Sequence, residues 1–341
     1  MDFIPQIQPW IDGRELAELK KVVDSGFISE NTATQEFERL IREFTGARHA
    51  LAYANGTLAL AASLMAMGVG SGDEVIVPDI TFAATSNAVI LAGATPVLCD
   101  VENDYWQISP ASLESKITAN TKALMPVHLY GMTADMDAIM RIAKERKLRV
   151  IEDAAESIGS RYKGRHVGFI GDLGIISFYP NKVVTTAEGA VVLTDNDDLA
   201  KEMYKMKNHG REKKGVFIHD SIGYNFSFSD LHAAVGIAQM KKLPEILEKK
   251  KKIHAHYKES FAGIKELKVL DAAPDTVSNY WFSNIQVPSA AVLEEHLKQN
   301  NIGSRRFFYP LHKQPCYKNQ YGLDADYPNS VRAFETCLSL P

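Results

Sequence analysis

The chain has 341 residues, of which 45% are hydrophobic and 23% are charged, and its formal net charge is −4. This composition is that of a folded globular protein, and it excludes the strongly basic surface with which many proteins bind nucleic acid or acidic membranes. The three cysteines lie far apart and match neither a disulfide framework nor a zinc site, so we predict no metal centre and a reducing compartment. The chain starts without a signal-peptide pattern and contains no apolar run of about 20 residues, so we expect a cytoplasmic protein with no membrane anchor.

Helical and strand-like segments alternate through the first two thirds of the chain. Apolar periodicity and one run rich in alanine and leucine predict helices at Gly13–Ser25, Thr34–Phe44, Asn55–Met67, Thr85–Ala92 and Asp135–Glu145. Short apolar runs predict strands at Glu74–Pro78, Thr95–Asp100, Ala123–Val127, 148–153, 175–179 and Ala190–Leu193. This alternation indicates an α/β fold with a mostly parallel central sheet that helices cover on both faces.

The last hundred residues follow a different pattern. The run Lys249–Lys252 is typical of a solvated helix face, and beyond it a strand is predicted at Tyr280–Val287 and a helix at Ala290–Asn300. We therefore expect a large α/β domain at residues 1–240 and a smaller α+β domain at residues 241–341.

Three features are predicted to meet at the edge of the sheet where parallel strands end, which is where α/β proteins bind ligands. The run Asn55-Gly56-Thr57 opens the buried helix, and the free N–H groups of a helix start favour an anion such as phosphate. Asp153 ends one buried strand, where a carboxylate needs a cation, and Lys182 follows the end of the next strand. Each feature also has an ordinary explanation, which is a helix cap for the first two and a solvated charge for the lysine.

Together the three features suit pyridoxal phosphate. This cofactor needs an amine for its aldehyde, an anion for its pyridine nitrogen and a seat for its phosphate. A lysine that holds the aldehyde exchanges readily with an incoming amine, and the freed lysine then carries protons. Phe82 comes just after the strand that ends at Pro78, so its ring is placed either to stack on the cofactor or to pack in the core.

The sequence resembles the DegT family of nucleotide-sugar aminotransferases, which are fold-type I pyridoxal phosphate enzymes. The resemblance runs from about Phe3 to Pro341 and rests on many motifs that occur in the family's order. These motifs are GFIS at 26, ANGTLAL at 54, GDEVIVPDITFAATSNAV at 72, GATPVLCDV at 93, EDAAESIG at 152, SFYPNK at 177, KNHGR at 207, GYNFSFSDLHAAVGIAQM at 223 and FFYPLHKQPCY at 307.

The resemblance implies a role for each matching residue. Lys182 would form the Schiff base and act as general acid and base, Asp153 would pair with the pyridinium, and Phe82 would stack on the ring. Glu156 would lie beside the cofactor near its 3-hydroxyl group, where many relatives have glutamine or histidine. The phosphate would be held by Gly56, Thr57 and Ser177, and by Asn225 of the neighbouring subunit, which implies a homodimer with shared active sites.

The resemblance also implies the reaction. L-Glutamate would donate the amino group and a nucleotide-linked 4-keto-6-deoxyhexose would accept it, in the synthesis of amino sugars for a glycoside or for surface polysaccharide such as the lipopolysaccharide O-antigen. The region SFYPNK to TTAEGA favours the perosamine-synthase branch and a GDP-linked sugar, while a 3-keto sugar and a UDP- or dTDP-linked sugar stay open. Related dehydratases have histidine in place of Lys182, so the lysine favours an aminotransferase. The substrate-binding residues would be Tyr309, His312, Arg211 and Arg305, although a solvated surface position is the simpler explanation for the two arginines.

The sequence departs from the family pattern in three places. Ala187 and Ala190 stand where relatives often have glycine, which would shift the loop beside Lys182. Glu156 changes the charge next to the cofactor. The chain also stops at LSLP where relatives usually continue, so we expect the small domain to be shortened or disordered at its end, with some loss of stability.

Two other classes of protein remain as alternatives. The first is a non-catalytic relative that binds the cofactor and serves as a regulator or scaffold, against which the intact Lys182, Asp153 and Ser177 argue. The second is a dinucleotide-binding dehydrogenase, which would need a G-x-G-x-x-G turn that opens a helix. The glycines of residues 68–72 form a turn before a strand instead, so the pattern disfavours this class.

Overall fold

A seven-stranded sheet forms the centre of the computed structural model, which describes residues 2–213, 215–317 and 320–341. The strands lie in the order β1-β9-β8-β5-β4-β2-β3. Their bounds are β1 (His49–Tyr53), β2 (Glu74–Pro78), β3 (Thr95–Cys99), β4 (Thr121–Leu124), β5 (Arg149–Asp153), β8 (Leu173–Ser177) and β9 (Ala190–Thr194). Strand β9 pairs antiparallel with β1 and β8, and the other neighbours run parallel, so the predicted mostly parallel sheet is confirmed.

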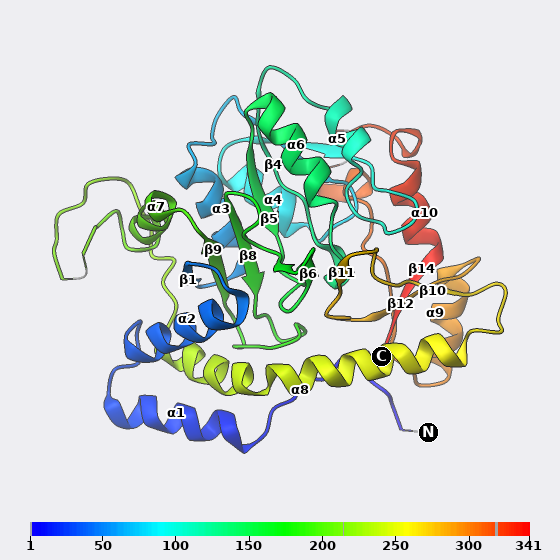
Figure 1. The fold of residues 1–341 in the computed structure, drawn as a ribbon, viewed down its shortest axis with the longest axis horizontal. Coiled ribbons are helices and arrows are strands. Elements are labelled where there is room, and N and C mark those ends of the chain that lie inside the picture. Colours follow the sequence, from blue (N-terminus) through cyan, green and yellow to red (C-terminus); the bar gives the residue numbers. More distant parts are fainter. Residues whose placement is uncertain (1, 214, 318–319) are drawn as a thin grey trace.

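Helices cover both faces of this sheet (Figure 1). Their bounds are α1 (Gly13–Ser25), α2 (Thr32–Thr45), α3 (Gly56–Ala66), α4 (Ala84–Leu91), α5 (Pro110–Ser115), α6 (Met136–Arg146), α7 (Asp197–Lys207), α8 (Asp230–Ser260), α9 (Ala290–Gln299) and α10 (Pro328–Thr336). Successive side chains of a strand point to opposite faces, and β9 shows the result. Val191 and Leu193 pack in the cluster that contains residues of α2 and α8, whereas Ala190 and Val192 pack with α3 and α4.

A buried carboxylate fixes the start of α2 against α8. The residue before α2, Asn31, makes no side-chain cap of its own. Instead the Asp230 carboxylate accepts hydrogen bonds from the backbone N–H groups of Asn31 (2.7 Å), Ala33 (3.0 Å) and Thr34 (2.9 Å). A negative charge at a helix N-terminus is stabilising, so this contact sets both where α2 begins and how it packs on α8.

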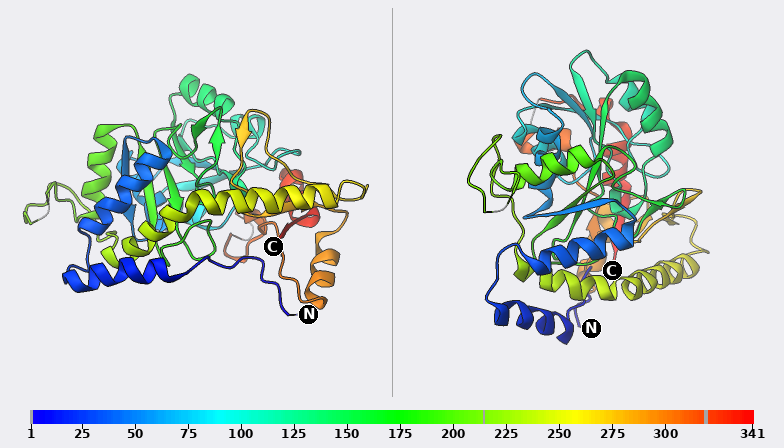
Figure 2. Two further views of the ribbon diagram at one scale, coloured as in Figure 1. Left: turned by 60° about the horizontal axis from the view of Figure 1, so that its bottom comes forward. Right: turned by 60° about the vertical axis from the view of Figure 1, so that its left-hand side comes forward.

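The long helix α8 connects the central sheet to a second sheet. The strands of the second sheet are β10 (Lys268–Val269), β12 (Ser283–Gln286), β13 (Arg305–Arg306) and β14 (Cys337–Leu340) in the order β10-β12-β14-β13. The α8 ribbon runs beneath both sheets, next to α1 at one end (Figures 1 and 2). The expected domain boundary at residue 240 falls inside α8, where Met240 and Leu243 share a buried cluster with Trp281 from the second part of the chain.

Three short strands add a further link between the two parts of the chain. Strands β6 (Arg161–Tyr162), β7 (Arg165–His166) and β11 (Thr276–Val277) form a small sheet in which β11 pairs with β6. Strand β14 (Cys337–Leu340), close to the end of the chain, pairs with β12 on one side and with β13 on the other. Across the described part of the chain, no helix has the length and apolar character to cross a membrane.

Candidate active site

A cavity of about 740 Å³ opens where β5 and β8 end. These two strands are parallel neighbours, so the residues that follow them meet at one edge of the sheet. The cavity is lined by many residues that the sequence pointed to, namely Gly56, Thr57, Phe82, Asp153, Glu156, Ser177, Lys182 and Arg305. They come from distant segments of the chain, and the fold brings them to one place.

One end of the cavity is formed by the start of α3. Asn55 caps the helix, because its side-chain oxygen accepts a hydrogen bond from the N–H of Leu58 at 3.0 Å. Gly56 lies close to Ser177, since a Cβ atom added to Gly56 would lie 3.6 Å from the Ser177 Cβ and 3.7 Å from its hydroxyl oxygen. The N–H groups of a helix start and a serine hydroxyl therefore line the same small space, which is the arrangement that a phosphate requires.

Asp153 is a buried carboxyl group at the end of β5, with 5% of its surface exposed. One of its oxygens accepts a hydrogen bond from the Thr85 hydroxyl at 2.8 Å, and the other accepts from the N–H of Ala155 at 3.2 Å. Burial raises the pKa of the Asp153 carboxyl, and the Thr85 hydrogen bond and the charge of Lys182 only partly oppose this effect. A carboxylate in such a place is stabilised by a cationic partner, such as a protonated pyridine nitrogen.

Lys182 turns its amine toward the cavity. Its Nζ atom lies 3.4 Å from Oε1 of Glu156 and 4.1 Å from the centre of the Trp281 ring. The lysine side chain is only 13% exposed, so the simple explanation of a solvated charge is wrong. Burial raises the pKa of the Glu156 carboxyl, while the charge of Lys182 and the N–H of Tyr130, at 2.7 Å, act in the opposite direction.

Aromatic side chains form one wall of the cavity, and of these only Phe82 was predicted from the sequence. Phe82 is 60% exposed, and its ring centre lies 5.9 Å from that of Phe308. Phe308 stacks on Tyr130 at 5.2 Å, and Tyr130 stacks on Trp281 at 5.9 Å. The aromatic run NYWF at residue 279 was the one visible signal for Trp281. Nothing in the local sequence of the others predicts that they meet.

The loop beside Lys182 has a backbone shape that suits glycine better than alanine. Ala187 has φ +70°, which is the left-handed region, and Gly189 has φ +150°. The loop is held in this shape by hydrogen bonds from the N–H of Ala187 to the Thr185 hydroxyl at 3.0 Å and from the Thr186 hydroxyl to the carbonyl of Glu188 at 2.6 Å. Alanine at this position therefore carries conformational strain.

We expect Ala187→Gly to increase the free energy of unfolding by about 0.5–1 kcal/mol. The left-handed conformation costs an alanine roughly 1–2 kcal/mol, and the greater freedom of glycine in the unfolded chain cancels part of the gain. Equilibrium denaturation of the cofactor-free protein measures the change. Ala190→Gly is the matched control, because Ala190 lies buried in β9 and glycine there should destabilise the protein. A less stable Ala187→Gly variant would contradict the assigned strain.

Four residues predicted for binding do not line this cavity. Asn225 and Arg211 belong to the arm between α7 and α8, whose middle part projects from the rest of the chain (Figures 1 and 2), and Asn225 forms a β-bridge with Asn208 just after α7. Asn225 is exposed, and Arg211 donates hydrogen bonds to the backbone and side chain of Asn208. Tyr309 is 39% exposed and follows Phe308 just outside the lining.

His312, the fourth of these residues, lies buried between two carboxylates. Its Nδ1 is 2.8 Å from Oδ2 of Asp79, and its Nε2 is 3.0 Å from Oδ1 of Asp324. Its backbone N–H also donates to Asp79 at 2.8 Å. Asp79 comes three residues before Phe82, so His312 ties the segment that carries Phe308 to the segment that carries Phe82.

The stability that His312 provides should depend on pH. Burial alone would lower the pKa of His312, but the hydrogen bonds and charges of Asp79 and Asp324 outweigh it and raise the pKa above the usual 6.5. Because the pKa of His312 is raised in the folded state, its contribution to the free energy of unfolding is complete below about pH 6.5. This contribution is lost as the pH rises through the raised pKa. We expect His312→Asn to lower the free energy of unfolding by about 1–3 kcal/mol at pH 5.5. The deficit should shrink by pH 9, and denaturation curves in which it grows with pH would contradict this assignment.

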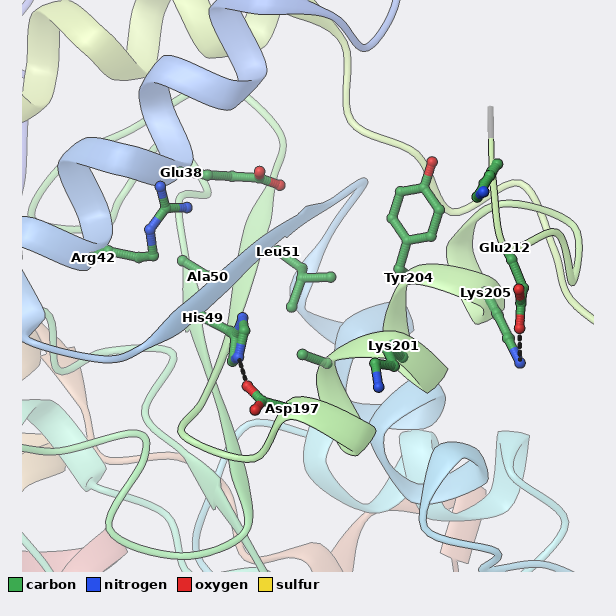
Figure 3. Close-up of a pocket in the computed structure, with 12 residues that line it drawn as sticks. Glu38, Arg42, His49, Ala50, Leu51, Asp197, Lys201, Tyr204, Lys205 and Glu212 are labelled. Carbon is green, nitrogen blue, oxygen red and sulfur yellow. Dashed lines mark hydrogen bonds and ion pairs between the residues drawn. The ribbon is translucent and has the colours of Figure 1, made fainter. Parts of the chain in front are cut away.

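A second cavity of about 720 Å³ lies beside the edge strand β1, between α2 and α7 (Figure 3). Two pairs of its charged groups contact each other. His49 lies 2.6 Å from Asp197, and Lys205 lies 3.2 Å from Glu212 (Figure 3). The residues that line it include none of those predicted for catalysis or binding. Among the described residues, no group of histidine, cysteine and acidic side chains is arranged to hold a metal ion.

The fold and the site define a class of protein. The sequence profile of the DegT/DnrJ/EryC1/StrS aminotransferase family matches residues 9–341, and the chain belongs to this family. It is a pyridoxal phosphate-dependent aminotransferase of the fold-type I class, as the motifs predicted.

Individual relatives support the same conclusion. The chain is 39% identical to a GDP-perosamine synthase of Escherichia coli O157:H7, across 94% of this chain and 89% of that protein. It is 35% identical to the spore coat polysaccharide biosynthesis protein SpsC of Bacillus subtilis, across 99% and 92%. The crystal structure of DesV from S. venezuelae, in complex with a ketimine intermediate, superposes with a TM-score of 0.94 at 30% identity and covers 100% of this chain and 93% of that one.

Proposed function

We propose that this chain transfers an amino group from L-glutamate to a nucleotide-linked 4-keto-6-deoxyhexose, with a GDP-linked sugar of the perosamine type as the favoured acceptor. The observation that carries the proposal is one cavity in which an amine, a buried carboxylate and an open helix start meet. The GDP-perosamine synthases among the relatives support the choice of sugar. A 3-keto sugar or a UDP- or dTDP-linked sugar is the alternative acceptor.

Each part of the cavity has a task in this reaction. Bound pyridoxal phosphate supplies an electron sink that allows an amino group to pass from one substrate to the other. Lys182 anchors the cofactor and moves the proton at its Nζ atom, and Asp153 stabilises the positive charge on the pyridine nitrogen. Gly56, Thr57 and Ser177 would hold the phosphate, and the exposed ring of Phe82 would pack against the pyridine ring. Glu156 keeps the free amine directed into the cavity.

The arm between α7 and α8 supports a homodimer with shared sites. Phe217 and Ile222 on this arm are each 81% exposed, which suits a surface that a second copy covers. In the proposed dimer, Asn225 reaches the phosphate in the neighbouring subunit and Arg211 lies near the substrate diphosphate. Arg305 from the chain's own cavity contacts the same diphosphate, with Tyr309 on the adjoining segment. We place the enzyme in the cytoplasm, where nucleotide sugars are made.

The test combines absorbance with peptide mapping. The purified protein with pyridoxal phosphate should be yellow, L-glutamate should bleach the band, and borohydride should fix the cofactor onto the peptide that contains Lys182. The same mapping on Lys182→Ala is the control. A protein that stays colourless with added cofactor would contradict the proposal. A panel of GDP-, UDP- and dTDP-linked keto sugars then decides the acceptor, and a preference for a UDP- or dTDP-linked sugar would replace the GDP assignment.

A further inference from the structure

Trp281 holds both the amine of Lys182 and the backbone beside it. Its side chain is buried, and its Nε1–H donates a hydrogen bond at 2.6 Å to the carbonyl oxygen of Asn181, the residue before Lys182. The centre of its ring lies 4.1 Å from Nζ of Lys182. A positive charge within about 6 Å of an indole centre is attracted to the face of the ring. The ring of Trp281 is therefore placed to hold the amine of Lys182 in this position.

The residues before Trp281 hold the loop that carries Glu156. The Asn279 side-chain amide donates to the carbonyl oxygens of Glu156 at 2.8 Å and of Ile158 at 3.0 Å. Its side-chain oxygen accepts from the backbone N–H of Trp281 at 2.9 Å. We call Asn279–Trp281 the brace. This short segment contacts the loop that carries Glu156, and it also contacts Lys182 and the residue before it.

The middle residue of the brace has an unusual backbone. Tyr280 has φ +48°, in the left-handed region that a bulky side chain rarely adopts. Surrounding contacts impose it, because the Tyr280 hydroxyl donates to Asp271 at 3.0 Å and its ring stacks on His254 at 3.9 Å. Lys250 on α8 adds a hydrogen bond of 2.8 Å to the carbonyl oxygen of Trp281. Strained residues that their neighbours hold in place cluster at functional sites.

We propose that the brace Asn279–Trp281 is the positioning element of the active-site amine, with the indole of Trp281 holding the protonated amine of Lys182 when it is not bonded to the cofactor. Two groups then fix the amine, the Trp281 ring on one side and the Glu156 carboxylate, at 3.4 Å, on another. The inference rests on the proposed function of Lys182. Trp281 lies outside the segments that contribute Gly56, Asp153 and Lys182 to the cavity. We assign it as a positioning residue and not as a catalytic one.

The proposal predicts the chemical reactivity of Lys182 in the full-length, cofactor-free protein. A small acylating reagent such as acetic anhydride modifies only neutral amines, and mass spectrometry of the Lys182 peptide gives the rate at a fixed pH of 8. In Trp281→Leu the amine loses the ring that holds it in place, so we expect this rate to rise roughly tenfold. Trp281→Phe keeps a weaker ring and should give a smaller rise. Trp106→Phe is the matched control, because Trp106 is also buried but lies outside the cavity lining, and it should leave the rate unchanged.

Several outcomes would overturn the proposal. One is a Trp281→Leu protein that folds, as circular dichroism shows, and labels Lys182 at the unmodified rate. If Trp281→Leu does not fold, the labelling rate of Trp281→Phe decides in the same way. Acylation needs no bound cofactor, so its failure counts against the brace alone. Failure of borohydride to fix the cofactor on Lys182 in the unmodified protein counts against the proposed function alone.

Discussion

Lys182→Ala should lower kcat by roughly 10⁴-fold or more, because the cavity loses both its covalent anchor and its proton carrier. Lys182 is the one lysine among the described residues that line the cavity, so no neighbouring amine replaces it. Asp153, Ser177 and the start of α3 remain in this variant. We therefore expect the cofactor to bind without a covalent bond and to be removed by gel filtration more readily than from the unmodified protein.

Steady-state kinetics with L-glutamate and a GDP-linked 4-keto sugar measure the loss. Lys249→Ala is the control, since Lys249 lies on the exposed side of α8 with 58% of its side chain in solvent, and its activity should be unchanged. Activity of Lys182→Ala within tenfold of the unmodified enzyme would exclude Lys182 as the anchor.

Asp153→Asn should have opposite effects on cofactor binding and on stability. The amide has no charge for the pyridine nitrogen, so the dissociation constant for pyridoxal phosphate should rise by roughly 10²–10³-fold, as when one member of a buried charge pair is removed. The free energy of unfolding of the cofactor-free protein should increase slightly. Burial raises the pKa of the Asp153 carboxyl, so its ionisation at neutral pH costs folding free energy that asparagine avoids.

Cofactor titration followed by absorbance gives the dissociation constant for pyridoxal phosphate. Denaturation of the cofactor-free protein gives its free energy of unfolding. Glu156→Gln makes the same change of charge beside the amine, where many relatives carry glutamine, and should change cofactor affinity by less than about tenfold. If Asp153→Asn destabilises the cofactor-free protein while cofactor affinity is kept, Asp153 serves the fold and not the cofactor.

Local patterns were enough to predict the residues that end strands and begin helices. Asp153 and Lys182 follow apolar strands, and Gly56 opens an alanine-rich helix, so each position can be read from a few neighbouring residues. Trp281 could not be predicted in this way, because its partner Asn181 is 100 residues away in the sequence. The left-handed backbone of Tyr280, the residue before Trp281, likewise depends on tertiary contacts.

His312 shows the same limit. The motif around it suggested a residue that faces the substrate, and its surroundings in the sequence give no sign of burial. Its partner Asp79 is 233 residues away, and only the folded chain brings the two together. The domain boundary expected at residue 240 lies within α8 (Asp230–Ser260).

The continuity of α8 has a consequence for how such a protein can change during evolution. Its 31 residues form a helix about 46 Å long that packs beneath both sheets. If the chain were divided near residue 240, neither part would keep a complete hydrophobic core. Met240 and Leu243 would lose neighbours on whichever side they were left. We therefore expect surface loops, such as the arm after α7, to tolerate exchange better than a recombination point within α8 does.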